Sequence, residues 1–406
     1  MIALNRRQFS SLALAFAGPA ARLLAAPSLS DTLRSSMTRR KIPNVVAMVA
    51  TADKITYTGA FGKRDMASGI DVKPDSIFAI ASMTKAITAT AAMQLVEQGK
   101  IQLREPVSRF LPELAKLDVI TGFDKAGKPI LRPSTKPVTL HHLLTHTSGF
   151  AYDTWDESML KYNNLHGGPA AGTVAPLTPL IFEPGTRWQY GTSMDWAGKL
   201  VEAVSGLTLE QYFQRNILRP LGMKDTTFIF PAAKFDRLVS SSRRQPDGSL
   251  KEDPRKPPAP PTAYNGGGGL FSTAPDYVLF MQMILKQGHG PSGAILQPKT
   301  VATMTTNQIG DVSAGKLKTY RPAISSDVDF HPGFTDGFTY GFLINKTAYQ
   351  GGRSAGSLAW AGVENTFYWI DPRRSLCAAV MMQFFPFVDS QAVGLLSDFE
   401  KAVYAT

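Results

Sequence analysis

Cysteine is almost absent from this chain, and so are the patterns that would connect it to nucleic acid or to a membrane. The single cysteine, Cys377, cannot form an internal disulfide, and its apolar neighbours predict a small core residue rather than a nucleophile. The formal net charge is +11, but there is no run of five lysines and arginines and no strip of interleaved aromatic and basic residues. We therefore expect no nucleic-acid partner.

Metal-binding and phosphate-binding motifs are also missing. His142 and His146 are four residues apart, but no glutamate completes H-E-x-x-H and no third ligand is evident, so we predict no metal site. The glycine run at 266–269 is not followed by the lysine of a phosphate-binding loop. We expect a tight turn there and no cofactor.

The first 26 residues resemble an export signal. Arg6 and Arg7 precede a short apolar run at 12–18, and small residues at 24–26 offer a cleavage site. Twin arginines before a mildly hydrophobic region are typical of the Tat signals of bacteria. The apolar run is too short and too rich in alanine and glycine for a stable membrane span. We therefore predict a Tat-type signal at 1–26 and a periplasmic or secreted protein.

The two ends of the chain predict strands, and the middle predicts mainly helices. The ranges 44–50 and 54–61 form a predicted hairpin, and three strand-like segments between 357 and 385 precede a closing helix from about Asp389. The expected fold class is α/β, more narrowly α+β, with a mostly antiparallel sheet built from both chain ends and flanked by helices. The predicted domains are a sheet domain at 27–105 and 320–406 and a mainly helical domain at 106–319, with the active site between them.

Ser82-Met83-Thr84-Lys85 is the most informative stretch. It places a serine hydroxyl and a lysine amine three residues apart, at the start of a predicted helix that runs to Gln98. A serine hydroxyl is a weak nucleophile until a neighbouring group takes its proton, and a lysine one turn along can do so. The free N–H groups of a helix start also favour negative charge there. Ser82 is thus a candidate nucleophile; the alternative is that it only caps the helix.

Spacing alone does not decide between these two roles, because S-x-x-K occurs three times. One further copy begins at Ser158 in a polar stretch, and another begins at Ser313 in a segment without periodicity. Only Ser82 follows an apolar run, at 77–81, and precedes a long helical pattern without glycine or proline. This context favours Ser82.

A second candidate is Tyr190, which follows a Pro-Gly turn at 184–185 and precedes a predicted helix. Binding and catalytic residues collect on such loops, and a tyrosine beside a lysine ammonium can serve as a general base. Tyr162 is an alternative, since it begins a Y-x-N pattern found in some serine hydrolases, but no Pro-Gly turn precedes it. Tyr190 is preferred, although either tyrosine alone is compatible with a structural role.

The third candidate is Trp360-Ala361-Gly362-Val363, on a predicted strand. A small residue and a glycine let a strand edge lie close to an acyl group. A backbone N–H there can join that of Ser82 to form an oxyanion hole. Taken alone, the segment is also compatible with an ordinary glycine-containing strand.

Together and in this order, the three elements resemble the serine β-lactamase and penicillin-binding-protein superfamily, and more narrowly class C β-lactamases and family VIII carboxylesterases. Further stretches similar to that group lie at 143–149, 268–274 and 369–372. The resemblance extends over roughly residues 40–400 and implies a β-lactamase-like fold.

The resemblance also implies roles for individual residues. Ser82 would be acylated, Lys85 would be its electrostatic and proton partner, and Tyr190 would be the base. Which of Lys85 and Tyr190 takes the first proton is a property of the coupled pair. The backbone N–H groups of Ser82 and Val363 would hold the oxyanion.

Two departures from the β-lactamase pattern bear on the substrate. Trp360-Ala361-Gly362 stands where β-lactamases usually have Lys-Thr-Gly, so an apolar wall replaces the charge that holds a β-lactam carboxylate. Thr192 stands where an asparagine is usual. Both departures are similar to the esterase branch. They imply that Trp360, Ala361, Gly362 and Thr192 bind an uncharged acyl or alcohol group.

The predicted function is therefore a serine esterase that hydrolyses small or short-chain carboxylic esters through an acyl-enzyme on Ser82. The alternatives on the same scaffold are a β-lactamase, a DD-peptidase or amidase, or an acyltransferase, and a penicillin-recognising protein without turnover. Retention of Lys85 and Tyr190 argues against the last, because a binding protein needs neither proton acceptor. The only partner expected is a small-molecule ester.

Overall fold

The computed structural model describes residues 27–168 and 176–405. The export signal predicted for residues 1–26 lies outside the described residues. Among the helices of the described ranges, none combines the length and the apolar character that crossing a bilayer requires.

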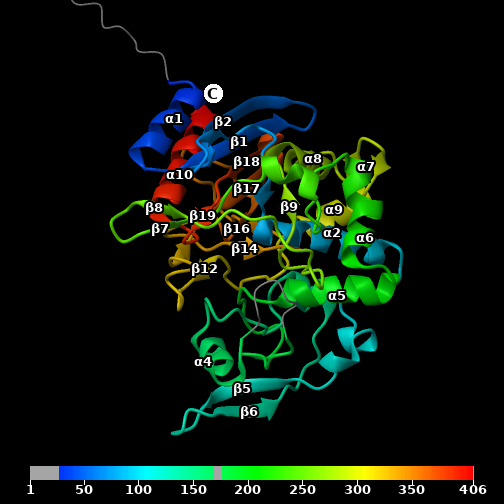
Figure 1. The fold of residues 1–406 in the computed structure, drawn as a ribbon. Coiled ribbons are helices and arrows are strands. Elements are labelled where there is room, and N and C mark those ends of the chain that lie inside the picture. The colour runs from blue at the N-terminus through cyan, green and yellow to red at the C-terminus, as the bar shows by residue number, and fades with distance from the viewer. Residues whose placement is uncertain (1–26, 169–175, 406) are drawn as a thin grey trace, which may run out of the picture.

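An eight-stranded sheet lies at the centre of the molecule (Figure 1), and neighbouring strands in it are antiparallel. In spatial order the strands are β14 (Gly337–Phe338), β15 (Leu343–Ile344), β16 (Leu358–Gly362), β17 (Thr366–Asp371), β18 (Leu376–Met381), β1 (Asn44–Thr51), β2 (Ile55–Asp65) and β3 (Ile70–Asp71). The N-terminal hairpin joins the C-terminal strands where β1 pairs with β18, with Val46 opposite Met381. The predicted antiparallel sheet built from both chain ends is confirmed.

Helices cover both faces of this sheet. On one face, α10 (Ser390–Ala405) places Phe399 against Trp369, and α1 (Leu29–Arg39) packs beside α10. On the other face, α8 (Ala274–Leu285) places Tyr277 against Tyr368, with ring centroids 4.9 Å apart. Neighbouring residues of a strand point to opposite faces, which is why Tyr368 and Trp369 contact different helices. Burial from both sides explains why β1 is apolar along nearly its whole length.

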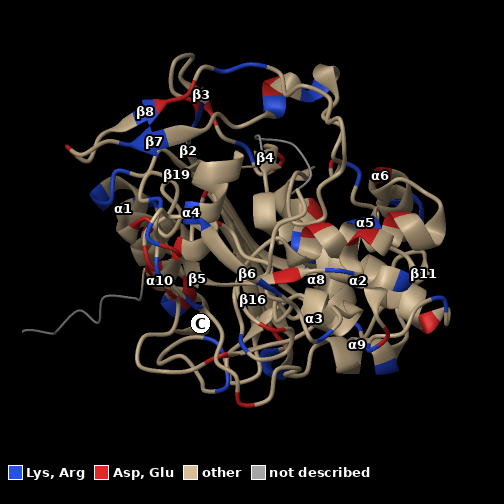
Figure 2. Ribbon diagram, turned by 90° about the horizontal axis from the view of Figure 1, so that it is seen from below, with Lys and Arg blue, Asp and Glu red and all other residues tan. Residues whose placement is uncertain are grey.

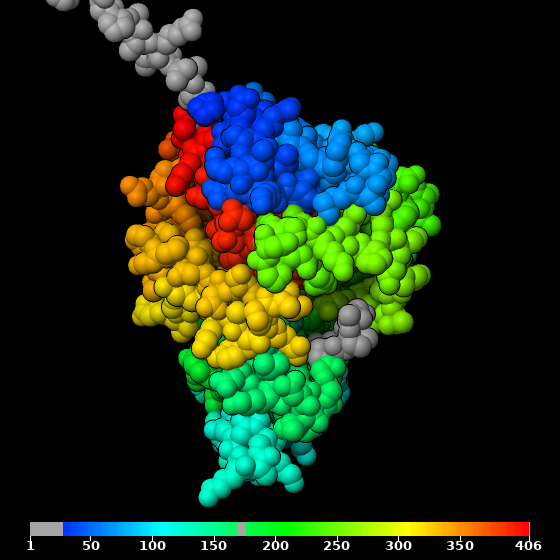
Figure 3. All heavy atoms as spheres, turned by 60° about the vertical axis from the view of Figure 1, so that its left-hand side comes forward, coloured from blue at the N-terminus to red at the C-terminus, as the bar shows by residue number. Residues whose placement is uncertain are grey.

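The remaining elements surround this core. The other helices are α2 (Thr84–Glu97), α3 (Leu140–Leu144), α4 (Glu157–His166), α5 (Ser193–Ser205), α6 (Leu209–Phe213), α7 (Arg219–Leu221) and α9 (Pro298–Met304). Four minor sheets have two strands each: β4 (Phe78–Ala79) with β9 (Phe271–Ser272), β5 (Asp118–Phe123) with β6 (Pro129–Pro133), β10 (His289–Gly290) with β11 (Gly293–Ala294), and β12 (Lys316–Leu317) with β13 (Val328–Asp329) among the described residues. A further sheet has three strands, in which β7 (Ser242–Arg244) lies between β19 (Phe384–Phe385) and β8 (Leu250–Glu252). The β5–β6 hairpin forms the narrow end of the molecule in Figure 3.

The packing of α8 bears on the predicted domain division. This helix belongs by sequence to the range 106–319, yet it packs directly on β1 and β18 of the sheet. Another helix of that range, α5, packs on α2. The two predicted ranges therefore share one core, and their boundaries stay a prediction.

The charged residues are mixed in sign. In the view of Figure 2, lysines and arginines are interspersed with aspartates and glutamates along the ribbon. Cys377 is fully buried on β18, and burial raises the pKa of its thiol to about 12. The expected small core residue is confirmed, because a thiol in this state does not supply a thiolate near neutral pH.

Candidate active site

Ser82 lies on a strained turn rather than on the helix itself. A 3-10 turn, η1 (Ala81–Met83), leads directly into α2, whose N-cap position is Met83. The alternative that Ser82 caps the helix is therefore wrong. Ala81 has a φ of 44°, which a residue with a side chain adopts at a cost of about 1–3 kcal/mol. The surrounding structure must hold this turn in place.

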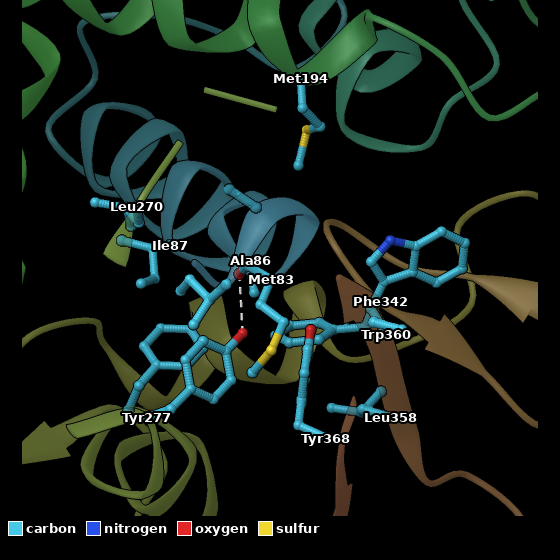
Figure 4. Close-up of a cluster of buried hydrophobic side chains, with 14 of the residues drawn as sticks. Met83, Ala86, Ile87, Met194, Leu270, Tyr277, Phe342, Leu358, Trp360 and Tyr368 are labelled. Atoms are coloured by element: carbon cyan, nitrogen blue, oxygen red, sulfur yellow. Dashed lines mark hydrogen bonds between the residues drawn. The ribbon is translucent and has the colours of Figure 1, made fainter. Parts of the chain in front are cut away.

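The support beneath the turn is a buried cluster. Tyr277 donates its hydroxyl hydrogen to the carbonyl oxygen of Met83 over 2.9 Å, and Figure 4 shows this bond together with the packing of Met83 near Tyr368. Met83 and Tyr368 are 0% and 1% exposed. Residues Thr84 to Leu95 of α2 are also buried, so the helix has no polar face that would let it move toward solvent. The serine is consequently presented on a rigid base.

Lys85 is buried against the serine and has three acceptors. It is 2% exposed, and its Nζ donates to Ser82 Oγ over 3.0 Å and to Tyr152 Oη over 3.3 Å. The third acceptor is the carbonyl oxygen of Gly267. Three acceptors around one buried amine offset the cost of burying it. The predicted proximity of Ser82 and Lys85 is confirmed.

A carboxylate, Asp195, lies on the far side of Tyr152. Tyr152 donates to Asp195 Oδ2 over 3.4 Å, and the Gly267 N–H donates to Asp195 Oδ1 over 3.2 Å. Burial raises the pKa of Asp195, and the charge on Lys85 lowers it in part. Burial and then the negative Asp195 raise the pKa of Tyr152 well above 10. Tyr152 therefore stays a neutral hydroxyl that links Lys85 to its buried counter-charge.

The glycine run at 266–269 makes this arrangement possible. A Cβ atom on Gly267 would lie 2.6 Å from the Asp195 carboxylate, and one on Gly266 would lie 2.5 Å from the carbonyl oxygen of Met194. Only glycine allows the backbone to approach α5 this closely. The expected tight turn thus brings one peptide segment against both Asp195 and Lys85.

Tyr190 and Trp360 form the wall of the site. Tyr190 is 2% exposed, and the centroid of its ring lies 4.8 Å from Lys85 Nζ. Trp360 Nε1 donates to Tyr190 Oη over 3.1 Å. The rings of Trp155, Tyr152 and His146 also lie within contact distance of Tyr190. The structure thus brings four of the predicted site residues together.

The alternative tyrosine lies elsewhere. Tyr162 is on α4, where its ring stacks on His166 with centroids 4.2 Å apart. It packs against a separate small cluster that includes Met159 and Phe182. The preference for Tyr190 over Tyr162 therefore agrees with the placement of both residues.

The end of β16 lies against the turn that carries the serine. A Cβ atom on Gly362 would lie 2.4 Å from the carbonyl oxygen of Ile80, so only glycine permits this contact. Val363 follows, partly buried, in the turn to β17. Ala361 is opposite Phe367 and points to the face opposite Trp360, so only its backbone can face a ligand on the Tyr190 side.

Thr192 is buried two residues after Tyr190, in the N-cap position of α5. Its Oγ1 has no hydrogen-bond partner within residues 27–168 and 176–405. An unpaired buried hydroxyl is costly, and a polar substrate group would satisfy it. A role for Thr192 in substrate binding stays a prediction.

Three residues of the site were not predicted from the sequence. Tyr152 follows the family-like stretch at 143–149, which is the one signal that pointed toward it. Asp195 and Gly267 carry no motif of their own, since the first lies inside a helix and the second inside a glycine run. Their roles depend on contacts between segments about 70 residues or more apart in the chain.

A G-x-S-x-G pentapeptide also occurs, at 352–356. In α/β-hydrolases this pattern marks a nucleophile on a strand–turn–helix. Here Ser354 lies in a loop, where its N–H donates to Asp371 and its carbonyl oxygen accepts from Asn345. The pattern does not form a nucleophile turn in this fold.

The described residues contain no group of three histidine, cysteine, aspartate or glutamate side chains that could hold a metal ion. His142 takes part in a helix cap. Its ring accepts from the Thr139 N–H, and Thr139 Oγ1 accepts from the His142 N–H, so the pair caps the start of α3.

Three histidines near the site predict sensitivity to acid. Burial is the main cause that lowers the pKa of His141 and His142 to about 4, with Arg104 contributing to both. Burial and then Lys85 hold the pKa of His146 well below its usual value. In the unfolded chain a histidine titrates near 6.5. Between these values the unfolded chain binds more protons at these histidines, so their contribution to the free energy of unfolding falls as the pH drops from about 6.5 toward 4.

Urea unfolding between about pH 7 and pH 4 measures this loss, to which His146 alone contributes up to about 1.4 kcal/mol per pH unit. His146→Asn should flatten the slope, and asparagine tolerates the φ of 55° at this position. His289→Asn is the matched control at an exposed histidine and should leave the slope unchanged. Equal slopes for the wild type and His146→Asn would contradict the assignment.

The chain is similar to known proteins over nearly its whole length. The family model described as Beta-lactamase matches residues 29–400. The monacolin J acid methylbutanoyltransferase of Aspergillus terreus is 32% identical over 407 residues, which cover 93% of this chain and 95% of that protein. The lovastatin esterase of Penicillium rubens is 31% identical over 387 residues, which cover 87% and 92%.

The likeness extends to three dimensions. A solved structure of a mutant simvastatin synthase from Aspergillus terreus matches with a TM-score of 0.79 at 33% identity. The match covers 93% of this chain and 96% of that chain. It therefore concerns the complete fold and not a single motif.

Proposed function

Because the chain belongs to the beta-lactamase family, we propose that it is a serine acyltransferase that moves a short acyl group from an ester donor to an alcohol acceptor through an acyl-enzyme on Ser82. Family membership makes it an enzyme of the serine hydrolase type with a β-lactamase-like fold, as the sequence predicted. The narrower assignment to family VIII stays a prediction. Acyl transfer was one of the alternatives to ester hydrolysis, and the relatives favour it.

One observation carries the chemistry: Lys85 Nζ lies 3.0 Å from Ser82 Oγ. A serine becomes an effective nucleophile when a neighbouring group takes its proton during attack. The tyrosine that lies over the same lysine, Tyr190, completes a proton-transfer unit. The proposed reaction uses only these side chains and requires neither a metal nor a cofactor.

The reaction has two steps that balance. Ser82 Oγ attacks the donor carbonyl carbon, its proton passes to the pair of Lys85 and Tyr190 and then to the leaving alcohol, and the ester bond of the donor breaks. The acceptor hydroxyl oxygen then attacks the acyl carbon, its proton passes to the same pair and on to Ser82 Oγ, and the bond between the acyl group and Ser82 breaks to release the new ester. The N–H groups of Ser82 and Val363 would stabilise the oxyanion in both steps.

The acyl group and the acceptor are proposed from the site and from the relatives. Trp360, Tyr190 and Trp155 form an aromatic wall that suits an uncharged group and limits the access of water. One relative is named for transfer of a methylbutanoyl group. A short branched acyl group and a hydroxyl on an apolar acceptor are therefore the proposed substrates.

The proposal is tested by competition between an alcohol and water for the acyl group. The purified protein is given p-nitrophenyl 2-methylbutanoate with increasing cyclohexanol or borneol. Release of p-nitrophenol reports acylation, and mass spectrometry separates the new ester from the free acid. We expect the ester to grow with acceptor concentration at the expense of the acid, because both nucleophiles attack one intermediate. Mass spectrometry of the digested protein should place the acyl group on Ser82.

Hydrolysis is the second candidate function, and the likeness to an esterase favours it. Production of the free acid alone at every acceptor concentration would support hydrolysis and contradict acyl transfer. A cephalosporin serves as the control substrate. Because Trp360 stands in place of the β-lactam-binding lysine, we expect its turnover to be much slower than that of the ester.

A further inference from the structure

The two predicted oxyanion donors belong to segments that no shared sheet connects. Ser82 follows β4, which forms a two-stranded sheet with β9. Val363 lies in the turn after β16, which belongs to the eight-stranded sheet. A distance between two donors can be kept constant only if some other group ties these segments together. Contact between Gly362 and Ile80 limits how closely they approach, but it supplies no bond.

Gln383 supplies bonds on the serine side. It follows β18 and is 2% exposed. Its Oε1 accepts from the Ala79 N–H over 3.0 Å, and its Nε2 donates to the Ala79 carbonyl oxygen over 3.5 Å. The amide thus satisfies both backbone groups of Ala79, three residues before Ser82, as a neighbouring strand would do.

The same glutamine is tied to the other donor through Glu364, the residue after Val363. The backbone carbonyl oxygen of Glu364 accepts from the Phe384 N–H over 3.1 Å. Its carboxyl group accepts from Ser241 and interacts with the Gln383 amide. Burial raises the pKa of Glu364, and these two hydrogen bonds lower it in part. A continuous path of contacts therefore runs from Ala79 through Gln383 to Glu364.

From these contacts we propose that Gln383 is a positioning residue that sets the separation of the two oxyanion donors. The inference rests on the proposed function, because it requires an acyl-enzyme on Ser82. Gln383 does not touch the reacting atoms; it acts through the backbone at Ala79 and Glu364. Ala81, with its strained φ, lies between Ala79 and Ser82. Loss of the Gln383 hydrogen bonds to Ala79 therefore lets this turn relax.

The expected effect follows from the geometry of oxyanion holes. Donors must lie about 2.7–3.1 Å from the oxyanion, and removal of one donor lowers kcat by about 10²- to 10³-fold. A displaced donor still contributes, so Gln383→Met should lower kcat by roughly 10- to 100-fold and change KM by less than about threefold. Methionine fills a similar volume but offers neither amide group.

Two variants separate positioning from folding. Gln282 is the matched control, since its Nε2 also donates to a backbone carbonyl, that of Thr51, over 2.9 Å. Gln282→Met should lose comparable stability in urea and keep its kcat. Complete labelling of both variants by a fluorophosphonate would show that the serine is still reachable.

The decisive measurement is the infrared stretch of a ¹³C-labelled acyl carbonyl on Ser82, recorded with an ester that deacylates slowly. Hydrogen bonds from an oxyanion hole lower this frequency, so we expect it to be higher in Gln383→Met than in the wild type and in Gln282→Met. An unchanged frequency and kcat in Gln383→Met would overturn the inference alone. The absence of any acyl band in the wild type would overturn the proposed function and the inference with it.

Discussion

Replacement of Ser82 by alanine should lower ester turnover by at least about 10⁴-fold, because the covalent intermediate can no longer form. The hydroxyl lies 3.0 Å from Lys85 Nζ on a turn that the core holds rigid. Steady-state release of p-nitrophenol measures the loss. The fold should survive, since alanine removes one oxygen from a side chain that caps no helix.

Two serines with equally suggestive sequence patterns are the matched controls. Ser158 begins another S-x-x-K on α4, but its lysine, Lys161, pairs with Glu157 over 2.9 Å instead. Ser354 is the centre of the G-x-S-x-G pentapeptide. We expect Ser158→Ala and Ser354→Ala to keep wild-type turnover. Full activity in Ser82→Ala, or its loss in either control, would reject Ser82 as the nucleophile.

The two tyrosines beside Lys85 should respond very differently to loss of their hydroxyl groups. Tyr190→Phe should lower kcat by about 10²- to 10⁴-fold, the range observed for removal of a general base. Tyr152→Phe should lower kcat by no more than about tenfold, the equivalent of one hydrogen bond. The reason is that the Tyr152 hydroxyl donates a hydrogen bond to Asp195. Burial and this carboxylate raise the pKa of Tyr152 well above 10. The hydrogen bonds of the described residues pair Tyr190 Oη with the N–H of Trp360, which donates to it, and with no carboxylate.

Both substitutions should lower the free energy of unfolding, because each leaves a buried partner unpaired; Tyr190→Phe leaves the Trp360 Nε1–H without its acceptor. Tyr152→Phe leaves Asp195 Oδ2 buried without its donor, which costs about 1–3 kcal/mol in the free energy of unfolding. Kinetics of p-nitrophenyl ester cleavage and urea unfolding of both variants provide the comparison. If Tyr152→Phe were the more severe catalytic defect, the base would have to be reassigned.

Local patterns predicted the elements of the sheet well. The β1–β2 hairpin, the three C-terminal strands and the closing helix α10 lie within a few residues of their predicted ranges. The buried strands are short apolar runs bounded by turn residues, and α10 carries apolar residues on one face with the period of a helix. The start of α2 was predicted less well. Burial of Met83 and its bond to Tyr277 force a 3-10 turn there, which helical periodicity does not indicate.

The N-terminal signal, the domain boundaries and the substrate-binding role of Thr192 stay predictions. The first lies outside the described residues. The domain boundaries divide a core that both predicted ranges share through α8. The role of Thr192 depends on a substrate that would form a hydrogen bond with its hydroxyl group.

The sequence by itself determined the class of chemistry. Ser82 and Lys85 are only three residues apart, so a single turn of backbone suffices to bring them together, and the adjacent apolar run anchors that turn in the core. The tertiary structure alone decided the surroundings of Lys85. Tyr152, Asp195 and Gly267 reach it from three separate segments, and only the close approach that glycine allows joins them. Contacts between distant segments depend on the packing of the whole chain, which no local pattern encodes.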